Sequence, residues 1–190
     1  MKIGLFFGSF NPVHIGHMII ANYMAENTDL DKIWLVVSPH NPLKDKSYLI
    51  NAYDRLEMCK LAFENHDKIS VSDIELHLPL PSYTIDTLTY LKEKYSEHEF
   101  SLIMGADNLA SIKKWKNYEI LLRDYHFYIY PRIKEVVTEF RSLDNVHLTE
   151  TPIIEISSTF IRNQIKSKKD ISYLVAENVK RFIELKSLYK

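Results

Sequence analysis

The chain has 190 residues, of which 46% are hydrophobic and 26% charged, a mixture that supports a buried core and excludes wholesale disorder. The formal net charge of −1 excludes a strongly basic field for nucleic acid, although it does not exclude a local basic pocket. Cys59 is the single cysteine, which excludes an intrachain disulfide and a multi-cysteine zinc site. The first apolar run, after Lys2, is too short for a signal sequence or a membrane span, so we expect a cytoplasmic protein without a membrane partner.

Short β-rich runs alternate along the chain with amphipathic helical stretches. The expected strands are Lys2–Phe7, Lys32–Val37, Lys68–Val71, Glu99–Met104, His126–Tyr130 and Val146–Leu148. The expected helices are Gly16–Glu26, Tyr53–Asn65, Thr84–Tyr95, Asn117–Asp124 and Lys134–Arg141, followed by a helical pattern over Ser157–Lys190 with a break near Ser167–Asp170. This alternation predicts an α/β fold with a mainly parallel sheet, in a single domain over residues 1–190 that ends in a small helical part from about residue 157.

The helix expected over Tyr53–Asn65 has an apolar stripe formed by Leu56, Cys59 and Phe63. We therefore interpret Cys59 as a small core side chain rather than a nucleophile. The stretch before this helix, Ser38–Asn51, is the least regular of the chain, and both a linker and a functional loop fit its composition. A connection of this length inside a compact domain favours the functional loop.

The first strand runs into the segment GSFNPVHIGH, in which an apolar strand ends at Phe7 and a turn begins at Gly8 and Ser9. A helix is expected to start near Ile15 or Gly16. Such a junction directs several backbone N–H groups and the positive end of a helix dipole at one spot, where a phosphate fits. The segment is neither a Walker loop nor a dinucleotide fingerprint, because the residues that define those motifs are absent.

In place of the charge that those other motifs carry, this segment has two histidines, His14 and His17. Three residues apart at a helix start, they can face the same way and bond phosphate oxygens, either as imidazolium or through a neutral N–H. The alternatives are two unrelated histidines near a turn, or a structural zinc site. The zinc site needs a third ligand, and H-I-G-H lacks the glutamate of the zinc-protease helix, so we expect no protein-built metal site.

A second segment, ISSTFIR, places Ser157, Ser158 and Thr159 at an expected helix start. Their hydroxyl groups and free amides suit a helix N-terminus, and Arg162, about one turn later, presents a fork that matches phosphate oxygens. The alternative is an ordinary capped helix with a surface arginine.

These two segments resemble the G-x-F-x-P-x-H-x-G-H and I-S-S-T-x-I-R signatures of the nucleotidyltransferase superfamily. The resemblance implies a Rossmann-like, doubly wound core with helices on both faces of the sheet. It implies that ATP is bound by Gly8, Ser9, Phe10, His14, His17, Ser157, Ser158, Thr159 and Arg162, the last four around the β- and γ-phosphates. The catalytic residues that it implies are His14, His17, Lys44 and Arg162.

Three further segments resemble the nicotinate-nucleotide adenylyltransferase family: PSYTIDTL, MGADN and KKWKN. In that family the positions of Tyr83 and Thr84 begin a helix whose amides meet a nicotinate carboxylate, Asp107 suits a ribose hydroxyl, and Trp115 stacks on the pyridine ring. Lys116 stands where an aromatic residue often follows the tryptophan in that family, and if its contact there is made by the backbone amide, the side chain matters little. The simpler readings are a plain helix start, a cap and a half-buried tryptophan.

Lys44, in the loop SPHNPLK, is expected to bind the acceptor phosphate or the ATP phosphates, the alternative being a solvated loop lysine. The role of His40 in this loop is left open, because the loop departs from the commonest form of the family. The remaining histidines are assigned to surface or structural roles, with His126 a candidate for burial: His66, His77, His98, His126 and His147.

The resemblance implies that the chain joins the AMP part of ATP to nicotinate mononucleotide, releasing nicotinate adenine dinucleotide and pyrophosphate in NAD biosynthesis. Mg²⁺ would accompany ATP, held chiefly by substrate and water. Three rivals stay open: an adenylyltransferase for another acceptor such as phosphopantetheine, a catalytically silent nucleotide-binding module, and a metal hydrolase. We expect no nucleic-acid partner, and the oligomeric state cannot be deduced from the sequence.

Overall fold

A parallel β-sheet forms the centre of the molecule in the computed structural model, which describes residues 1–39, 49–133 and 139–190. Within these residues the sheet has six strands in the order β3-β2-β1-β4-β5-β6, and every neighbouring pair is parallel. The strands are β1 (Lys2–Gly8), β2 (Lys32–Val37), β3 (Ile69–Ser72), β4 (Glu99–Gly105), β5 (His126–Tyr130) and β6 (Val146–Leu148). Each predicted strand is therefore confirmed to within about a residue at its ends.

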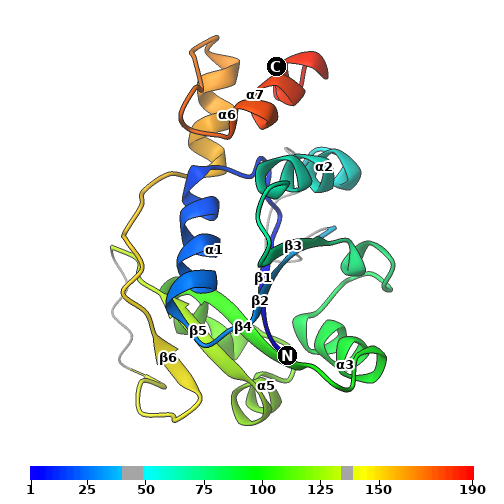
Figure 1. Ribbon diagram of the computed structural model, residues 1–190, viewed down its shortest axis with the longest axis vertical. Helices are drawn as coiled ribbons and strands as arrows, with labels where there is room; N and C mark the ends of the chain where they lie inside the picture. The colour runs from blue at the N-terminus through cyan, green and yellow to red at the C-terminus, as the bar shows by residue number, and fades with distance from the viewer. Residues whose placement is uncertain (40–48, 134–138) are drawn as a thin grey trace.

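Helices cover both faces of this sheet (Figure 1). The α-helices are α1 (Ile15–Asn27), α2 (Ala52–Phe63), α3 (Thr84–Lys94), α4 (Ala106–Ala110), α5 (Tyr118–Asp124), α6 (Ser158–Lys166) and α7 (Glu177–Leu185). Two 3-10 turns, η1 (Ile74–Leu76) and η2 (Ile112–Lys114), complete the described elements. None of the described helices is both long enough and apolar enough to cross a membrane. The expected doubly wound, Rossmann-like architecture is confirmed.

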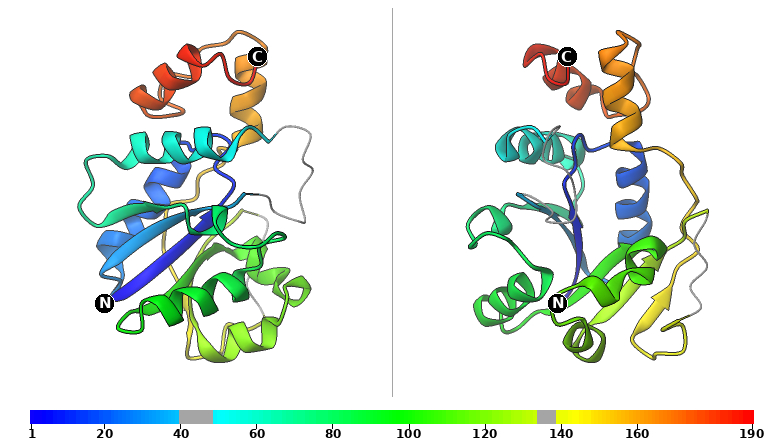
Figure 2. Two further views of the ribbon diagram at one scale, coloured as in Figure 1. Left: turned by 90° about the vertical axis from the view of Figure 1, so that its right-hand side faces the viewer. Right: turned by 180° about the vertical axis from the view of Figure 1, so that it is seen from behind.

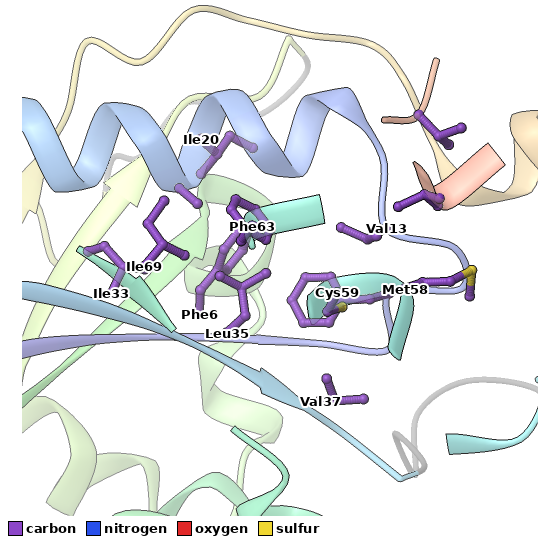
Figure 3. Packing of buried hydrophobic residues seen from close by; sticks show 14 of the residues in the cluster. Phe6, Val13, Ile20, Ile33, Leu35, Val37, Met58, Cys59, Phe63 and Ile69 are labelled. Carbon is purple, nitrogen blue, oxygen red and sulfur yellow. The ribbon is translucent and has the colours of Figure 1, made fainter. Parts of the chain in front are cut away.

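Two separate hydrophobic cores lie on the two faces of the sheet. Helices α1 and α2 pack on one face, where Ile20, Phe63 and Cys59 meet strand residues such as Leu35 (Figure 3). Helices α3, α4 and α5 pack on the other face through residues such as Leu88. Cys59 is fully buried, and burial raises the pKa of its thiol, so its interpretation as a core side chain is confirmed.

The strand order places a topological switch point beside β1. From β1 the chain winds outward through β2 to β3, and it then returns to the other side of β1 and continues through β4 and β5 to β6. In such sheets the connections after the two central strands diverge, which opens a crevice at the carboxyl ends of those strands. Helices α6 and α7 lie together at one end of the molecule, beyond the start of α1 (Figures 1 and 2).

Several predicted features differ from the structure. The short elements α4, η1 and η2 were not expected, because three to five residues are too few to show a helical period. The helix expected over Lys134–Arg141 lies largely outside the described residues, and Glu139–Arg141 form bends and a turn instead. The break in the C-terminal helical pattern extends over residues 167–176. His126 was wrong as a candidate for burial, because it opens β5 at the exposed amino end of the strand.

Candidate functional site

Gly8, at the end of β1, and Phe10, in the loop between β1 and α1, pack closely against each other. Phe10 has a positive φ of 45°, uncommon for a non-glycine residue, and its ring is buried against Phe6, with ring centroids 5.7 Å apart. A Cβ atom on Gly8 would lie 2.7 Å from the Phe10 ring. A side chain at position 8 would therefore displace this ring from beneath the loop.

The imidazole rings of His14 and His17 stack on each other, with centroids 3.7 Å apart and planes 26° apart. His14 precedes the first residue of α1, and its backbone N–H donates to Nδ1 of His17 over 3.2 Å. Because this Nδ1 accepts a hydrogen bond, the neutral His17 ring carries its proton on Nε2. The tautomer that the sequence left open is thereby assigned, and it makes Nε2 of His17 a hydrogen-bond donor.

His14 is neutral at physiological pH for a different reason. Its side chain is buried, and burial together with the nearby positive charge of Arg132 lowers its pKa to about 4. Among the described residues no partner hydrogen-bonds its buried Nδ1. Of the two forms considered from the sequence, the structure therefore supports the neutral imidazole for His14.

The C-terminal motif meets the histidine loop directly, although the two are far apart in the sequence. Ser158 donates from Oγ to the carbonyl oxygen of Pro12 over 2.8 Å, and Arg162 donates from Nη1 to that of Asn11 over 2.8 Å. Ser157 caps α6 by accepting the N–H of Phe160 over 3.1 Å. The two motifs that were predicted to bind phosphate therefore lie together above the carboxyl end of β1.

Thr159 and Tyr189 extend this junction. The hydroxyl oxygen of Thr159 accepts from Nη2 of Arg162 over 3.1 Å. A guanidinium has five N–H donors, so the two contacts of Arg162 leave capacity for phosphate oxygens. Tyr189, which the sequence analysis did not single out, donates to the side-chain oxygen of Asn11 over 2.9 Å and is itself buried. No local pattern signals this contact, because its partner is 178 residues away.

A pocket of about 360 Å³ lies beside the junction, lined by Asp107, Arg132, Ser157 and the residues from Ile153 to Ile156. Arg132 lies two residues after the end of β5, and its Nε lies 3.5 Å from Oδ1 of Asp107. Asp107 was predicted from the sequence but Arg132 was not, although its place shortly after an apolar strand was an available signal. A Cβ atom on Gly16 would lie within 3.6 Å of Ile154 and 3.1 Å of the His14 ring, so the pocket adjoins the histidines.

Three of the residues proposed for the acceptor, Tyr83, Thr84 and Lys116, lie together at the start of α3. Tyr83 is its N-cap residue and Thr84 its first residue. The ammonium group of Lys116 lies 4.8 Å from the centroid of the Tyr83 ring and 2.8 Å from a carboxylate oxygen of Asp86. The side chain of Lys116 thus contacts both Tyr83 and Asp86 at this helix start. Trp115 is half-buried against the core below α3. Lys44 and His40 lie outside the described residues.

Beneath the start of α3 lies Glu75, a buried carboxylate that the sequence analysis missed. Burial raises its pKa, and hydrogen bonds from the hydroxyl groups of Ser38, Thr87 and Ser82 lower it in part. The Thr87 hydroxyl donates over 2.9 Å. The carboxylate therefore connects η1, the end of β2 and the first turn of α3.

The fold and these paired motifs define a nucleotidyltransferase. Residues 5–164 match the model of the family described as Cytidylyltransferase-like, to which the chain belongs. Within this class it belongs to the nicotinate-nucleotide adenylyltransferases, as its curated relatives show. The Flavobacterium johnsoniae protein named "Probable nicotinate-nucleotide adenylyltransferase" is 55% identical over 100% of both chains, and the Cytophaga hutchinsonii protein of the same name is 51% identical over 100% of this chain and 98% of its own.

Solved structures agree with the fold. The structure of Plasmodium falciparum nicotinic acid mononucleotide adenylyltransferase complexed with NaAD has a TM-score of 0.83 and 22% identity, covering 99% of this chain and 97% of its own. A putative nicotinate-nucleotide adenylyltransferase from Vibrio parahaemolyticus has a TM-score of 0.74 and 19% identity, covering 99% and 94%. At these identities the similarity establishes the architecture.

Proposed function

We propose that this chain transfers the AMP part of ATP to the phosphate of nicotinate mononucleotide, forming nicotinate adenine dinucleotide and pyrophosphate in NAD biosynthesis. The observation that carries the proposal is the junction of the two motifs, in which Ser158 and Arg162 bond the carbonyls of Pro12 and Asn11. This junction supports one polyphosphate site made from both ends of the chain. The named relatives support the choice of acceptor.

On the ATP side, the loop from Gly8 to Phe10 and the start of α6 would hold the triphosphate. Helix α6 has nine residues, and the positive end of its dipole faces the histidine loop through Ser158. Arg162 would contribute charge-assisted bonds to the β- and γ-phosphates. The pocket lined by Asp107 and Arg132 has the size for a nucleoside. Asp107, which was expected from the sequence to bind the acceptor, lies in this pocket and would accept from a ribose hydroxyl group.

On the acceptor side, the first turn of α3 would select a carboxylate over an amide. The amides of Thr84 and Ile85 lie in the first turn, where helix geometry provides no intrahelical acceptor. A carboxylate accepts at both oxygens, whereas the amide of nicotinamide leaves one donor poorly matched, at a cost of about 1–3 kcal/mol. Trp115 would stack on the flat pyridine ring, and Lys44 would bind a phosphate.

In the reaction, an oxygen of the acceptor phosphate forms a bond to the α-phosphorus of ATP as the bond to the bridging oxygen breaks and pyrophosphate leaves. No covalent enzyme intermediate is needed, because the acceptor phosphate is already a nucleophile. The protein acts by positioning and by stabilising charge in the transition state. His17, with its proton on Nε2, would donate to an α-phosphate or bridging oxygen, and neutral His14 would support it from beneath.

Mg²⁺ is proposed to accompany ATP, and its part would be to neutralise phosphate charge. In the described part of the chain, no group of three or more His, Cys, Asp or Glu side chains is arranged to hold a metal ion. The donor set around the histidine loop consists of imidazole, hydroxyl and guanidinium groups rather than the carboxylates that Mg²⁺ prefers. This set fits a cation held by substrate oxygens and water.

The deciding experiment measures pyrophosphate release with MgATP and one of four acceptors: nicotinate mononucleotide, nicotinamide mononucleotide, phosphopantetheine or flavin mononucleotide. We expect the highest kcat/KM with nicotinate mononucleotide. A preference for phosphopantetheine would refute the acceptor while leaving adenylyl transfer intact. Absence of release with every acceptor would support the silent binding module, and hydrolysis that needs zinc but no acceptor would support the metal hydrolase.

A further inference from the structure

Arg55, in the first turn of α2, is a fully buried guanidinium that the mechanism above does not use. It donates from Nη1 to the carbonyl oxygens of Ser9 and Ser38, over 2.5 and 2.8 Å. It also donates from Nη2 to that of Pro39 over 3.0 Å, and from Nε to that of Ile50 over 3.2 Å. One side chain therefore joins the histidine loop, the end of β2 and the start of α2.

The partners of Arg55 are unusual for a buried charge. Within the described residues no carboxylate pairs with it, and all four acceptors are backbone carbonyls. A buried charge without an ion-pair partner is costly, and the carbonyl dipoles only partly replace the lost water. An apolar side chain of the same length would fill this space without that cost, so packing alone does not explain an arginine here.

The bond to Ser9 determines the direction of the next amide. The Ser9–Phe10 peptide is not among the cis bonds of the described chain, so its C=O and N–H point in opposite directions. The carbonyl points at Arg55, which is wholly inside the protein. The N–H of Phe10 therefore points away from Arg55.

We propose that Arg55 is a positioning residue for adenylyl transfer, which holds the Ser9–Phe10 peptide so that its N–H faces the bound triphosphate. This inference rests on the proposed function. Arg55 is too deeply buried to touch substrate, so it acts through the loop. It also keeps Phe10 in its positive-φ conformation, because the same peptide cannot rotate without leaving the guanidinium.

The test compares Arg55→Lys and Arg55→Met with the wild type. Lysine keeps the charge but lacks the planar fork that spans the four carbonyls, and methionine removes both. The matched control is Arg181→Met, because Arg181 is an exposed arginine of α7 paired with Glu177. For each protein, kcat and KM are measured while ATP and nicotinate mononucleotide are varied in turn, below the thermal unfolding midpoint of that variant.

We expect Arg55→Met to lower kcat/KM for ATP by about 10²-fold, the loss that a displacement of about 1 Å can cause. The KM of Arg55→Met for nicotinate mononucleotide should stay within about threefold of the wild-type value. The kcat/KM of Arg55→Lys for ATP should fall between those of the wild type and Arg55→Met. The Arg181→Met control should match the wild type. Inorganic tripolyphosphate, a probe of the phosphate loop alone, should inhibit Arg55→Lys more weakly than the wild type.

Either folded Arg55 variant with wild-type kinetics for ATP overturns the inference. An equal loss of kcat/KM for both substrates that parallels the loss of thermal stability also overturns it. So does the failure of both variants to fold, since each of these results indicates a purely structural arginine. The failure of the proposed function is distinguishable: the wild type would then release no pyrophosphate from any acceptor. In that event, tripolyphosphate binding to the wild type and to Arg55→Lys, measured by calorimetry, still tests the loop, and equal affinities reject the inference.

Discussion

His17 owes its function in the proposed mechanism to one hydrogen bond, from the His14 backbone to its Nδ1. That bond leaves the proton on Nε2, so replacement by alanine removes one donor to the transition state. We expect His17→Ala to lower kcat by about 10²–10³-fold. His17→Gln, which puts an amide donor near the Nε2 position, should retain more activity.

Pyrophosphate release at saturating substrates measures this effect. His77→Ala is the control, because His77 is an exposed histidine that contacts Asp73 outside the site. A His17→Ala enzyme with near-normal turnover would show that the ring does not donate to the reacting phosphate.

The burial of His14 predicts a dependence of stability on pH. Its pKa falls from 6.5 to about 4 on folding, so between these values the unfolded chain binds the proton more readily. The free energy of unfolding should therefore fall as pH drops from about 6.5 towards 4, by up to ~3 kcal/mol from this group. The pKa of His147 is also lowered, by burial and by His126, and adds in the same direction.

Urea unfolding at pH 7, 5.5 and 4.5 checks this expectation. A neutral side chain at position 14 removes the titration, so His14→Gln should show a shallower fall than the wild type over the same range. Parallel curves for the two proteins would mean that His14 is accessible to protons in the folded state.

In β1, one of the two central strands, a side chain at position 4 would have to displace its neighbours. A Cβ atom on Gly4 would lie 2.6 Å from Cδ1 of Leu30 and 2.7 Å from Cδ1 of Ile103, both in the core. We expect Gly4→Ala to lower the free energy of unfolding by about 1–3 kcal/mol through overpacking. Urea unfolding at pH 7 measures it, with Ser70→Ala on the exposed side of β3 as the control, expected to change it by less than about 0.5 kcal/mol.

The strands were predictable because a parallel strand buried on both faces appears as an unbroken apolar run, as in Ile33–Val37. The anion-binding loop was predictable because a strand, a turn and a helix start are consecutive in sequence. The inward orientation of the Arg55 side chain was not predictable, since a charged residue in an amphipathic helix is expected to face water. Its spacing of three and four residues from the buried Met58 and Cys59 was the available signal.

The site as a whole depends on contacts across the full chain, which no local pattern reveals. Of the contacts described above, the hydrogen bond between Tyr189 and Asn11 joins the residues that are farthest apart in the sequence. Tyr189→Phe leaves the buried Asn11 oxygen without this donor, so we expect a loss of ~1–3 kcal/mol in stability and a higher KM for ATP.

Urea unfolding and kinetics with varied ATP measure the two effects. Tyr173→Phe is the control, because the Tyr173 side chain is 92% exposed. If Tyr189→Phe were as stable and active as the wild type, the C-terminal contact would be irrelevant to the loop. The roles of individual side chains towards ATP and the acceptor stay predictions until such variants are measured.

The buried thiol of Cys59 gives the protein an internal reporter of its own opening. A thiol-specific reagent reaches this sulfur only when α2 separates from the sheet, since the side chain has no exposed surface in the folded state. The rate of modification therefore follows the population of opened molecules. A bound nucleotide that holds the loops together should slow this reaction, so ligand affinity can be followed without any label or substitution.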